Sequence, residues 1–87
     1  MTYTVYYLYS IKLNKYYIGK TNNINRRLKE HNNGEEIYTK KGTPWTLIGY
    51  IECKDNNDAT KLESKFKKAK NPRYIKWYIE NHVKKDI

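Results

Sequence analysis

The sequence predicts a small α/β protein, an α+β sandwich in which helices flank a three-stranded, mainly antiparallel sheet in the order β-β-α-β-α-α. Three observations support this class. Three short segments are rich in Tyr, Val and Ile without helical spacing, which is typical of strands. Three other segments repeat apolar residues at intervals of three and four, as amphipathic helices do. The length of 87 residues suits a modest core, so we expect residues 1–87 to form a single domain.

A β-hairpin is predicted at the start of the chain. Residues Tyr3 to Ser10 (YTVYYLYS) form its first strand, and the polar segment Lys12 to Lys15 forms a turn longer than two residues. Residues Tyr16 to Gly19 then return as the second strand. The faces of this hairpin are expected to be filled by Tyr7, Tyr9 and Tyr16.

A short helix, a loop and a third strand follow the hairpin. Asn22 or Asn23 can cap the helix, because an Asn side-chain oxygen accepts hydrogen bonds from the free amides of the first turn. One face of this helix is formed by Ile24, Leu28 and His31. Residues Asn32 to Gly34 tolerate the left-handed conformation that ends a helix. We predict a polar loop over Glu35 to Pro44 and a strand over Trp45 to Glu52 (WTLIGYIE).

Two further helices complete the predicted fold. Residues Asp55 to Asp58 begin the first of them, whose apolar stripe consists of Ala59, Leu62, Phe66 and Ala69. Asn71 and Pro72 end that helix and begin the next, because proline suits the first helical turn. The core face of the last helix is formed by Tyr74, Ile75, Tyr78, Ile79 and Val83.

The charge balance indicates a polyanionic partner. Eighteen Lys and Arg residues against nine Asp and Glu residues leave a formal net charge of +9. A basic surface of this kind binds nucleic acid by releasing its condensed counterions. The short length excludes a large cofactor-binding enzyme and a catalytic module fused to a separate recognition domain.

Cysteine usage and hydropathy indicate an intracellular protein. Cys53 stands alone, so we expect no disulfide partner and no cysteine metal cluster. No segment approaches the roughly 20 apolar residues of a membrane span, so we expect no membrane association. The expected location is cytoplasmic, with a viral or phage origin also compatible, and the expected state is a monomer or a weak homodimer.

Several motifs occur in a fixed order along the chain. The first strand contains Thr4-Val5-Tyr6, and the second carries Tyr17-Ile18-Gly19 about ten residues later. Arg27 with His31 follows in the next helix, and Glu63 ends the segment ATKLE in a later helix. In this order and spacing the chain resembles the GIY-YIG nuclease superfamily from Tyr3 to about His82. It is most similar to small single-domain members, with a catalytic module like that of the UvrC-type repair nucleases. Thr4 departs from the family pattern, which has glycine at this position.

The resemblance implies a metal-dependent endonuclease that hydrolyses DNA phosphodiester bonds at a single-metal Tyr/Arg/Glu site. One divalent cation, Mg²⁺ or Mn²⁺, is the expected cofactor. Glu63 is the expected metal ligand, because Mg²⁺ keeps most of its waters and takes one or two protein carboxylates. Without the family pattern, pairing with Lys67 along a solvated helix would be the simpler explanation of Glu63.

The remaining catalytic roles concern the phosphate and the attacking water. Arg27 is expected to stabilise charge on the phosphate in the transition state, and Arg26, about 100° round the helix, to contact the DNA backbone. The resemblance implies a tyrosine base, which we assign to Tyr6, with Tyr17 orienting water or phosphate. A phenol with a pKa near 10 needs nearby cations to favour the phenolate. Lys20, Arg27 and the metal are the candidates for that influence.

Further contacts to nucleic acid are expected from Gly19, Lys20, Lys40 and Lys41. Glycine lets the backbone approach a phosphate closely. On a regular strand Lys20 faces away from Tyr17 and Gly19, so Lys20 reaches the site only if the strand twists near Gly19. His31 lies one helical turn after Arg27 and either relays a proton, binds phosphate or is a satisfied structural histidine.

Two alternatives of other classes fit the same sequence. The first is a catalytically inactive basic nucleic-acid-binding module of the same fold. The second is a small interaction protein that uses its lysines on an acidic partner. The complete set of Tyr6, Tyr17, Arg27 and Glu63 argues against the first, and steep salt dependence of DNA binding would argue against the second.

Overall fold

The computed structural model describes residues 2–35, 37 and 39–84, with side chains described as far as residue 81. The elements, in chain order, are β1 (Tyr3–Ser10), β2 (Lys15–Thr21), α1 (Ile24–Asn32), the 3-10 helix η1 (Lys40–Gly42), β3 (Thr46–Cys53), α2 (Asn56–Ala69) and α3 (Pro72–Lys84). The predicted order β-β-α-β-α-α is confirmed, with η1 as an additional short turn of helix. Within the described residues, no helix is both long enough and apolar enough to cross a bilayer.

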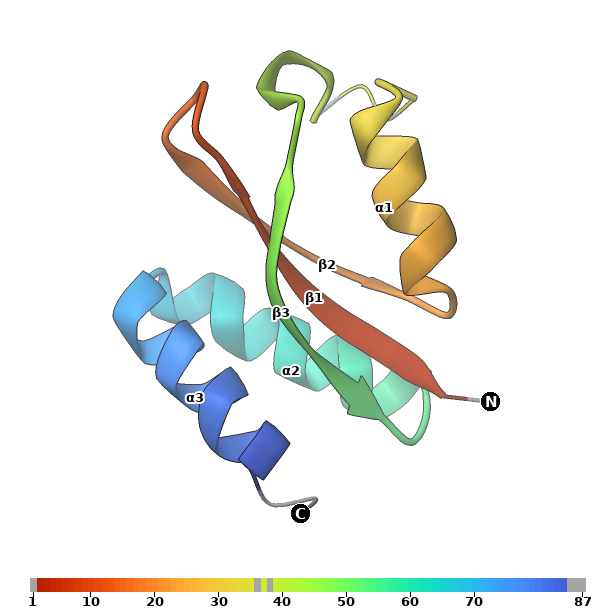
Figure 1. Cartoon of the computed structure of the whole chain (residues 1–87). Helices are drawn as coiled ribbons and strands as arrows, with labels where there is room; N and C mark the ends of the chain where they lie inside the picture. Colours follow the sequence, from red (N-terminus) through yellow and green to blue (C-terminus); the bar gives the residue numbers. More distant parts are fainter. Residues whose placement is uncertain (1, 36, 38, 85–87) are drawn as a thin grey trace.

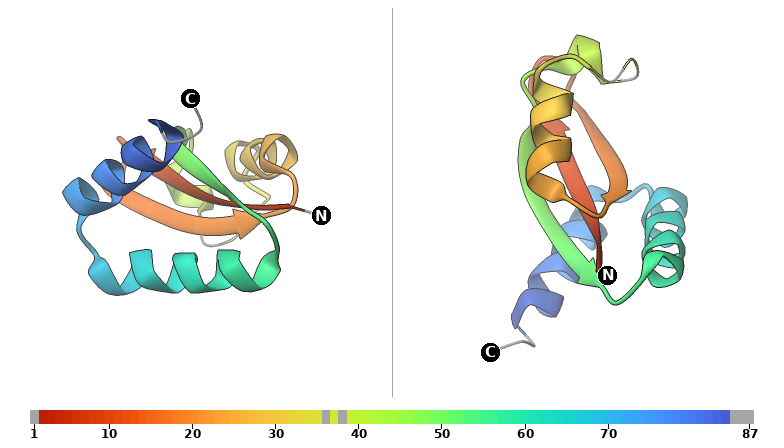
Figure 2. Two further views of the ribbon diagram at one scale, coloured as in Figure 1. Left: turned by 90° about the horizontal axis from the view of Figure 1, so that it is seen from below. Right: turned by 90° about the vertical axis from the view of Figure 1, so that its right-hand side faces the viewer.

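The sheet has the strand order β2-β1-β3, so the first strand lies in the centre. It pairs antiparallel with both neighbours, and Tyr6 lies directly between Gly19 of β2 and Tyr50 of β3. The strands separate α1 from α2 and α3 (Figure 1), and α1 and α2 lie on opposite sides of the sheet in Figure 2 (left). Because side chains alternate along a strand, β1 presents one set of residues to α1 and the other set to α2 and α3.

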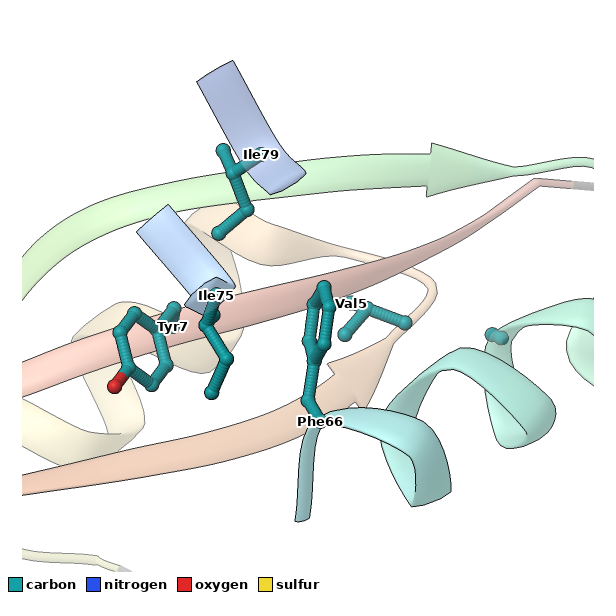
Figure 3. Close-up of a cluster of buried hydrophobic side chains, with 6 residues drawn as sticks. Val5, Tyr7, Phe66, Ile75 and Ile79 are labelled. Carbon is teal, nitrogen blue, oxygen red and sulfur yellow. The ribbon is translucent and has the colours of Figure 1, made fainter. Parts of the chain in front are cut away.

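The main core lies on the side of α2 and α3. Its buried members are Val5, Tyr7, Ala59, Phe66, Ile75 and Ile79 (Figure 3). The helix α3 packs closely on β3, since a Cβ added at Gly49 would lie 2.7 Å from Cγ2 of Ile79. Most of the predicted apolar stripes are confirmed, but Ala69 is exposed. It lies in the last turn of α2, directly before Lys70, which adopts a left-handed conformation with φ 50° and ends the helix. The side chain of Val83 lies outside the described residues.

The hairpin turn is longer than two residues, as predicted, but it occupies residues 11–14 and so ends one residue earlier than expected. Asn14 has a φ of 51° and completes the turn, so Lys15 is already the first residue of β2 and pairs with Ser10. The aromatic packing predicted for the hairpin is confirmed. Tyr16 stacks on Tyr7 with ring centroids 4.8 Å apart and packs at the same distance against Tyr9.

The predicted helix starts are confirmed by their capping hydrogen bonds. The amide of Arg26 donates to Oδ1 of Asn23 at 3.0 Å, and the amide of Asp58 donates to Oδ1 of Asp55 at 2.9 Å. At the start of α3, Oδ1 of Asn71 accepts from the amides of the second and third helical residues. These side chains satisfy amides that have no partner within the helix.

The segment between α1 and β3 is held by Trp45. Its backbone amide donates to Oδ1 of Asn32 at 2.6 Å, and its indole Nε1 donates to the carbonyl of Thr39 at 2.7 Å. The amide of Trp45 is therefore bonded to a side chain, and β3 begins one residue later than predicted. This arrangement also places Thr39 against α1, where its hydroxyl enters the candidate site.

Candidate active site

Tyr6 occupies the centre of the candidate site. Its side chain is 1% exposed and projects from β1 toward α1, on the side of the sheet opposite the main core. Gly19, the residue paired with Tyr6 on β2, makes room for the phenol. A Cβ at Gly19 would lie 2.4 Å from Oη of Tyr6 and 2.5 Å from Cζ. Glycine in the second motif is therefore explained by the tyrosine in the first. Thr4, the departure from the family pattern, is accommodated as a buried residue two positions earlier on β1.

A chain of hydrogen bonds surrounds the Tyr6 hydroxyl. His31 is fully buried, with Nε2 2.9 Å from Oη of Tyr6 and Nδ1 2.7 Å from Oγ1 of Thr39. Nε of Arg27 donates to the same Oη at 3.4 Å. One arrangement that satisfies both contacts has Oη accept from Arg27 and donate its own proton to Nε2 of His31. In this arrangement Nδ1 carries the imidazole proton and donates to Thr39.

Burial dominates the ionisation of Tyr6. Desolvation raises the pKa of the Tyr6 phenol to about 12, and the neighbouring Tyr17 and Glu63 act in the same direction. Arg27 lowers this pKa through its hydrogen bond and its charge, but by less than burial raises it. Of the two protein cations expected to favour the phenolate, Arg27 does act on Tyr6, whereas the Lys20 ammonium is bonded to α2. The resting form of Tyr6 at neutral pH is the neutral phenol.

Arg27 and Arg26 share one carboxylate. Nη1 of Arg27 donates to Oε1 of Glu30 at 3.1 Å, and Nε of Arg26 lies 3.8 Å from Oε2 of the same residue. The Arg27 side chain is 26% exposed and the Arg26 side chain 59% exposed. Arg27 is thus the more enclosed of the two arginines, and it is the one bonded to the Tyr6 hydroxyl. The Arg27 guanidinium lies between the Tyr6 hydroxyl and the Glu30 carboxylate, which fixes its position.

Lys20 is directed to the other side of the sheet. Its ammonium donates to Oδ1 of Asn56 at 2.7 Å and to Oγ1 of Thr60 at 2.6 Å, in the first turns of α2. No twist at Gly19 brings this ammonium to the Tyr6 hydroxyl. Lys20 instead ties β2 to the helix that carries Glu63.

Glu63 lies on α2, the helix on the far side of the sheet. Lys20 contacts the start of α2, and Ile18 lines a cleft together with Phe66 near its end. The helix thus runs antiparallel to β2. Glu63 lies on α2 between the part that contacts Lys20 and the part that carries Phe66, beside the edge strand. Its charge acts on the pKa of Tyr6, so the carboxylate lies within electrostatic reach of the phenol.

The carboxylate of Glu63 fits a weakly held, largely hydrated cation. Its side chain is 18% exposed, and within the described part of the chain its ion pair is with Nζ of Lys67 at 3.6 Å. Among the described residues, no group of three or more His, Cys, Asp or Glu side chains is arranged to hold a metal ion. Mg²⁺ commonly binds through one or two carboxylates and several waters. Glu63 matches that mode and does not form part of a protein cage.

The other predicted residues surround this centre at different distances. The Tyr17 ring lies 6.2 Å from that of Tyr6 and meets the His31 imidazole edge-on at 5.1 Å. Within the described residues, no hydrogen bond joins the Tyr17 hydroxyl to another group. Lys40 and Lys41 are exposed on η1, directly after Thr39.

Two polar residues at the site were not predicted as site residues. The hydroxyl of Thr39 is hydrogen-bonded to Nδ1 of His31, but Thr39 lies in an irregular segment where residue spacing gives no signal. Glu30 forms ion pairs with Arg26 and Arg27, which precede it by four and three residues on the same helix. This helical spacing predicts such pairs from the sequence. Both act on predicted residues and hold them in place.

Comparisons with known proteins give matches over most of the chain. Residues 2–78 match the family model of the GIY-YIG catalytic domain. The chain is 34% identical over 76 residues to a UPF0213 protein of Listeria welshimeri, covering 86% of this chain and 84% of that protein. A UPF0213 protein of Streptococcus pneumoniae is 33% identical over 76 residues, covering 86% and 77%. The solution NMR structure of a UPF0213 protein from Bacillus halodurans is similar with a TM-score of 0.55 and 26% identity, covering 92% of this chain and 84% of that one.

Proposed function

The chain belongs to the GIY-YIG family of nuclease domains, and on this premise we propose that it is a divalent-cation-dependent endonuclease that hydrolyses DNA phosphodiester bonds. The observation that carries the proposal is the arrangement around one buried phenol. Tyr6, His31 and Arg27 are joined by hydrogen bonds, and the Glu63 charge acts on the same phenol. Phosphodiester hydrolysis needs a proton acceptor for water, charge neutralisation at phosphate and a site for a cation.

Tyr6 and His31 together would accept the proton of the attacking water. As water attacks phosphorus, one of its protons passes to Oη of Tyr6, and the Tyr6 hydroxyl proton passes to Nε2 of His31. The imidazole becomes cationic while its Nδ1–H remains bonded to Thr39, 2.7 Å away. The phenol is neutral before and after this transfer, so its pKa of about 12 does not prevent it. This route assigns His31 a proton-relay role, one of the three expected from the sequence.

Arg27 would stabilise the phosphate. Its guanidinium already contacts the oxygen that receives the water proton, so a phosphate bound to Arg27 is held next to that oxygen. The ion pair with Glu30 fixes the guanidinium before substrate binds, which reduces the reorganisation needed in the transition state. Tyr17, on the adjacent strand, would orient the water or the phosphate from its position beside Tyr6 and His31.

Glu63 would hold the divalent cation, Mg²⁺ or Mn²⁺. When bound, such an ion supplies positive charge to the phosphate and to the leaving oxygen. Neutralising the Glu63 carboxylate also removes one of the influences that raise the pKa of Tyr6. Lys67 is the group that occupies the carboxylate before the cation binds.

The DNA backbone would cross the exposed basic residues around this centre. Arg26, Lys40 and Lys41 are exposed on α1 and η1, on the same side of the sheet as Tyr6. Lys20 extends this surface across the edge of β2 to α2. The net charge of +9 supplies the long-range attraction. These contacts are to phosphate and carry little sequence preference.

The proposal is tested by cleavage of labelled single-stranded, duplex, flap and junction DNA in Mg²⁺ and in Mn²⁺. We expect Tyr6→Phe and Glu63→Gln to lose at least about 100-fold in rate while keeping their circular dichroism spectra. The matched controls Tyr50→Phe and Glu52→Gln, both on exposed positions of β3, should cleave like the parent protein. Equal cleavage by Glu63→Gln and the parent protein would refute the assignment. Tight binding without cleavage of any substrate would instead identify the inactive DNA-binding module.

A further inference from the structure

A cleft beside the candidate site is not used by the proposed reaction. It lies between the edge strand β2 and the junction of α2 with α3, and its volume is about 440 Å³. Small-molecule sites commonly span about 300–1,000 Å³. The lining residues that matter here are Tyr7, Tyr16, Tyr17, Lys67 and Lys70.

The floor of the cleft carries a polar group without a partner. The Tyr7 side chain is 2% exposed, and its ring stacks on Tyr16 at 4.8 Å with an interplanar angle of 7°. No described residue forms a hydrogen bond with its hydroxyl. Every fully enclosed side-chain nitrogen or oxygen among the described residues does have a partner. The Tyr7 hydroxyl is therefore reachable from solvent, and in Figure 3 it points away from Val5 and Phe66.

The rim of the cleft is cationic and reaches the β2 edge of the sheet, next to the strand that carries Tyr17. Lys67 and Lys70 line it from the last turn of α2. Lys67 also contacts Glu63 at 3.6 Å. On the opposite side the lining includes Tyr17, whose ring lies 6.2 Å from that of Tyr6. A strand of DNA bound at the candidate site would reach the cleft by passing round the β2 edge at Tyr17.

We propose that this cleft binds one unstacked nucleobase of the DNA strand, at a nucleotide close to the scissile phosphate. The inference rests on the proposed function and adds a binding site to it. Aromatic walls suit the flat faces of a base, because stacking on aromatic side chains is insensitive to base identity. The Tyr7 hydroxyl can donate to or accept from the polar edge of the base. The ammonium groups of Lys67 and Lys70 suit the phosphate of the same nucleotide.

The chemistry of the cleft favours a nucleotide over other anions. An acidic peptide would satisfy the two lysines but would leave the aromatic floor and the buried hydroxyl without a suitable group. Because a base must leave its stack to enter, strands that are single or locally opened should bind better than uninterrupted duplex. Unstacking a paired base costs a few kcal/mol.

The test measures binding without cleavage. A short fluorescein-labelled oligothymidine is titrated in EDTA, beside the same oligomer with its central bases replaced by abasic sugars. Both carry the same phosphates, so their difference reports base contacts alone. We expect the abasic oligomer to bind about 5- to 100-fold more weakly, the value of one base stacked on an aromatic side chain.

Two variants with matched controls test whether the difference in affinity between the two oligomers arises in the cleft. Tyr7→Phe removes only the unpartnered hydroxyl and should weaken the intact oligomer about 3- to 10-fold while leaving the abasic one unchanged. Lys70→Ala should weaken both. The control for Tyr7→Phe is Tyr74→Phe, in the core but outside the cleft lining, which should leave the affinity for both oligomers unchanged. The control for Lys70→Ala is Lys68→Ala, which should reduce these affinities less than Lys70→Ala does. Thermal melting verifies that each variant is folded.

Three results would overturn the proposal: equal binding of the two oligomers, an equal effect of Tyr7→Phe on both, or equally effective competition by polyglutamate. None of them depends on catalysis. If the parent protein distinguishes the oligomers but cleaves no DNA in Mg²⁺ or Mn²⁺, the cleft is supported and the proposed function fails. If it cleaves DNA but does not distinguish them, the opposite holds.

Discussion

Replacing Gly19 with alanine should disable the candidate site by moving one side chain. A Cβ at this position would lie 2.4 Å from Oη of Tyr6 and 2.5 Å from Cζ, whereas ordinary contacts begin at 3.4 Å. The phenol must therefore move by about 1 Å. Its bonds to His31 and Arg27 are 2.9 and 3.4 Å long, so a shift of this size breaks the second and strains the first.

The expected cost has two separate components. Overpacking of this kind destabilises a fold by about 1–3 kcal/mol, which urea unfolding followed by tryptophan fluorescence measures. A misplacement of about 1 Å at a catalytic group costs on the order of 100-fold in rate, which single-turnover cleavage of labelled DNA measures. The backbone at Gly19 does not have a positive φ, so the steric effect is isolated from backbone strain.

Gly49→Ala is the matched control on the other side of the sheet. Its Cβ would lie 2.7 Å from Cγ2 of Ile79, so a similar loss of stability is expected. That contact lies in the main core, away from Tyr6, and cleavage should persist. The reasoning is refuted if Gly19→Ala keeps the stability of the parent protein, or if it cleaves as fast as Gly49→Ala.

Three further predictions concern ionisation, the hydrogen-bond chain and a helix cap. Burial raises the pKa values of Tyr6 and Tyr7 to about 12. The stabilisation from keeping these phenols neutral is complete below pH 10 and is lost as the pH rises toward 12, by about 2–3 kcal/mol at Tyr6 and by less at Tyr7, whose hydroxyl is reachable from solvent, as urea unfolding across this range would measure. Thr39→Val removes the acceptor of His31 Nδ1 and should lower the cleavage rate about 10-fold and alter its pH profile, with Thr39→Ser largely restoring both. Asp55→Ala removes the cap of α2 and should cost about 1 kcal/mol in urea unfolding without changing DNA binding.

Each of these has a clear contrary outcome. Stability independent of pH between 10 and 12 would contradict the burial of both phenols. A Thr39→Ser variant as slow as Thr39→Val would show that the hydroxyl is not what matters. An Asp55→Ala protein as stable as the parent would mean that the amide of Asp58 gains no stability from its bond to the cap.

Most of the fold follows from local patterns in the sequence. The caps at Asn23 and Asp55 and the alternation along β1 are local signals, and all of them appear in the structure. The boundaries that differ depend on contacts distant in sequence or on single residues in unusual conformations. Trp45 is excluded from β3 by a bond to Asn32, and the left-handed conformation of Asn14 ends the hairpin turn one residue before the predicted end.

The candidate site divides in the same way. The residues expected at its centre were named because of a resemblance in motif order, and the structure brings Tyr6, Arg27 and His31 together. The direction of the Lys20 side chain depends on its hydrogen bonds to Asn56 and Thr60 in α2, which are distant in sequence and cannot be predicted from residue spacing. The high pKa of Tyr6 follows from burial between a sheet and a helix, a property of packing and not of neighbouring residues in the chain.

The two edge strands of the sheet, β2 and β3, differ in whether they can pair with a strand of another chain while the candidate site stays open. Gly19, Tyr17 and the cleft all lie at the β2 edge, so a second chain that paired with β2 would cover both the candidate site and the proposed base pocket. Self-association through strand addition is compatible with access to DNA only at β3. In β3, Ile48 has no pairing partner in β1, because the register shifts between Tyr7 and Leu8. Such an irregularity in an edge strand hinders the addition of another strand. An attachment point or fusion partner that must leave DNA access intact therefore belongs on β3.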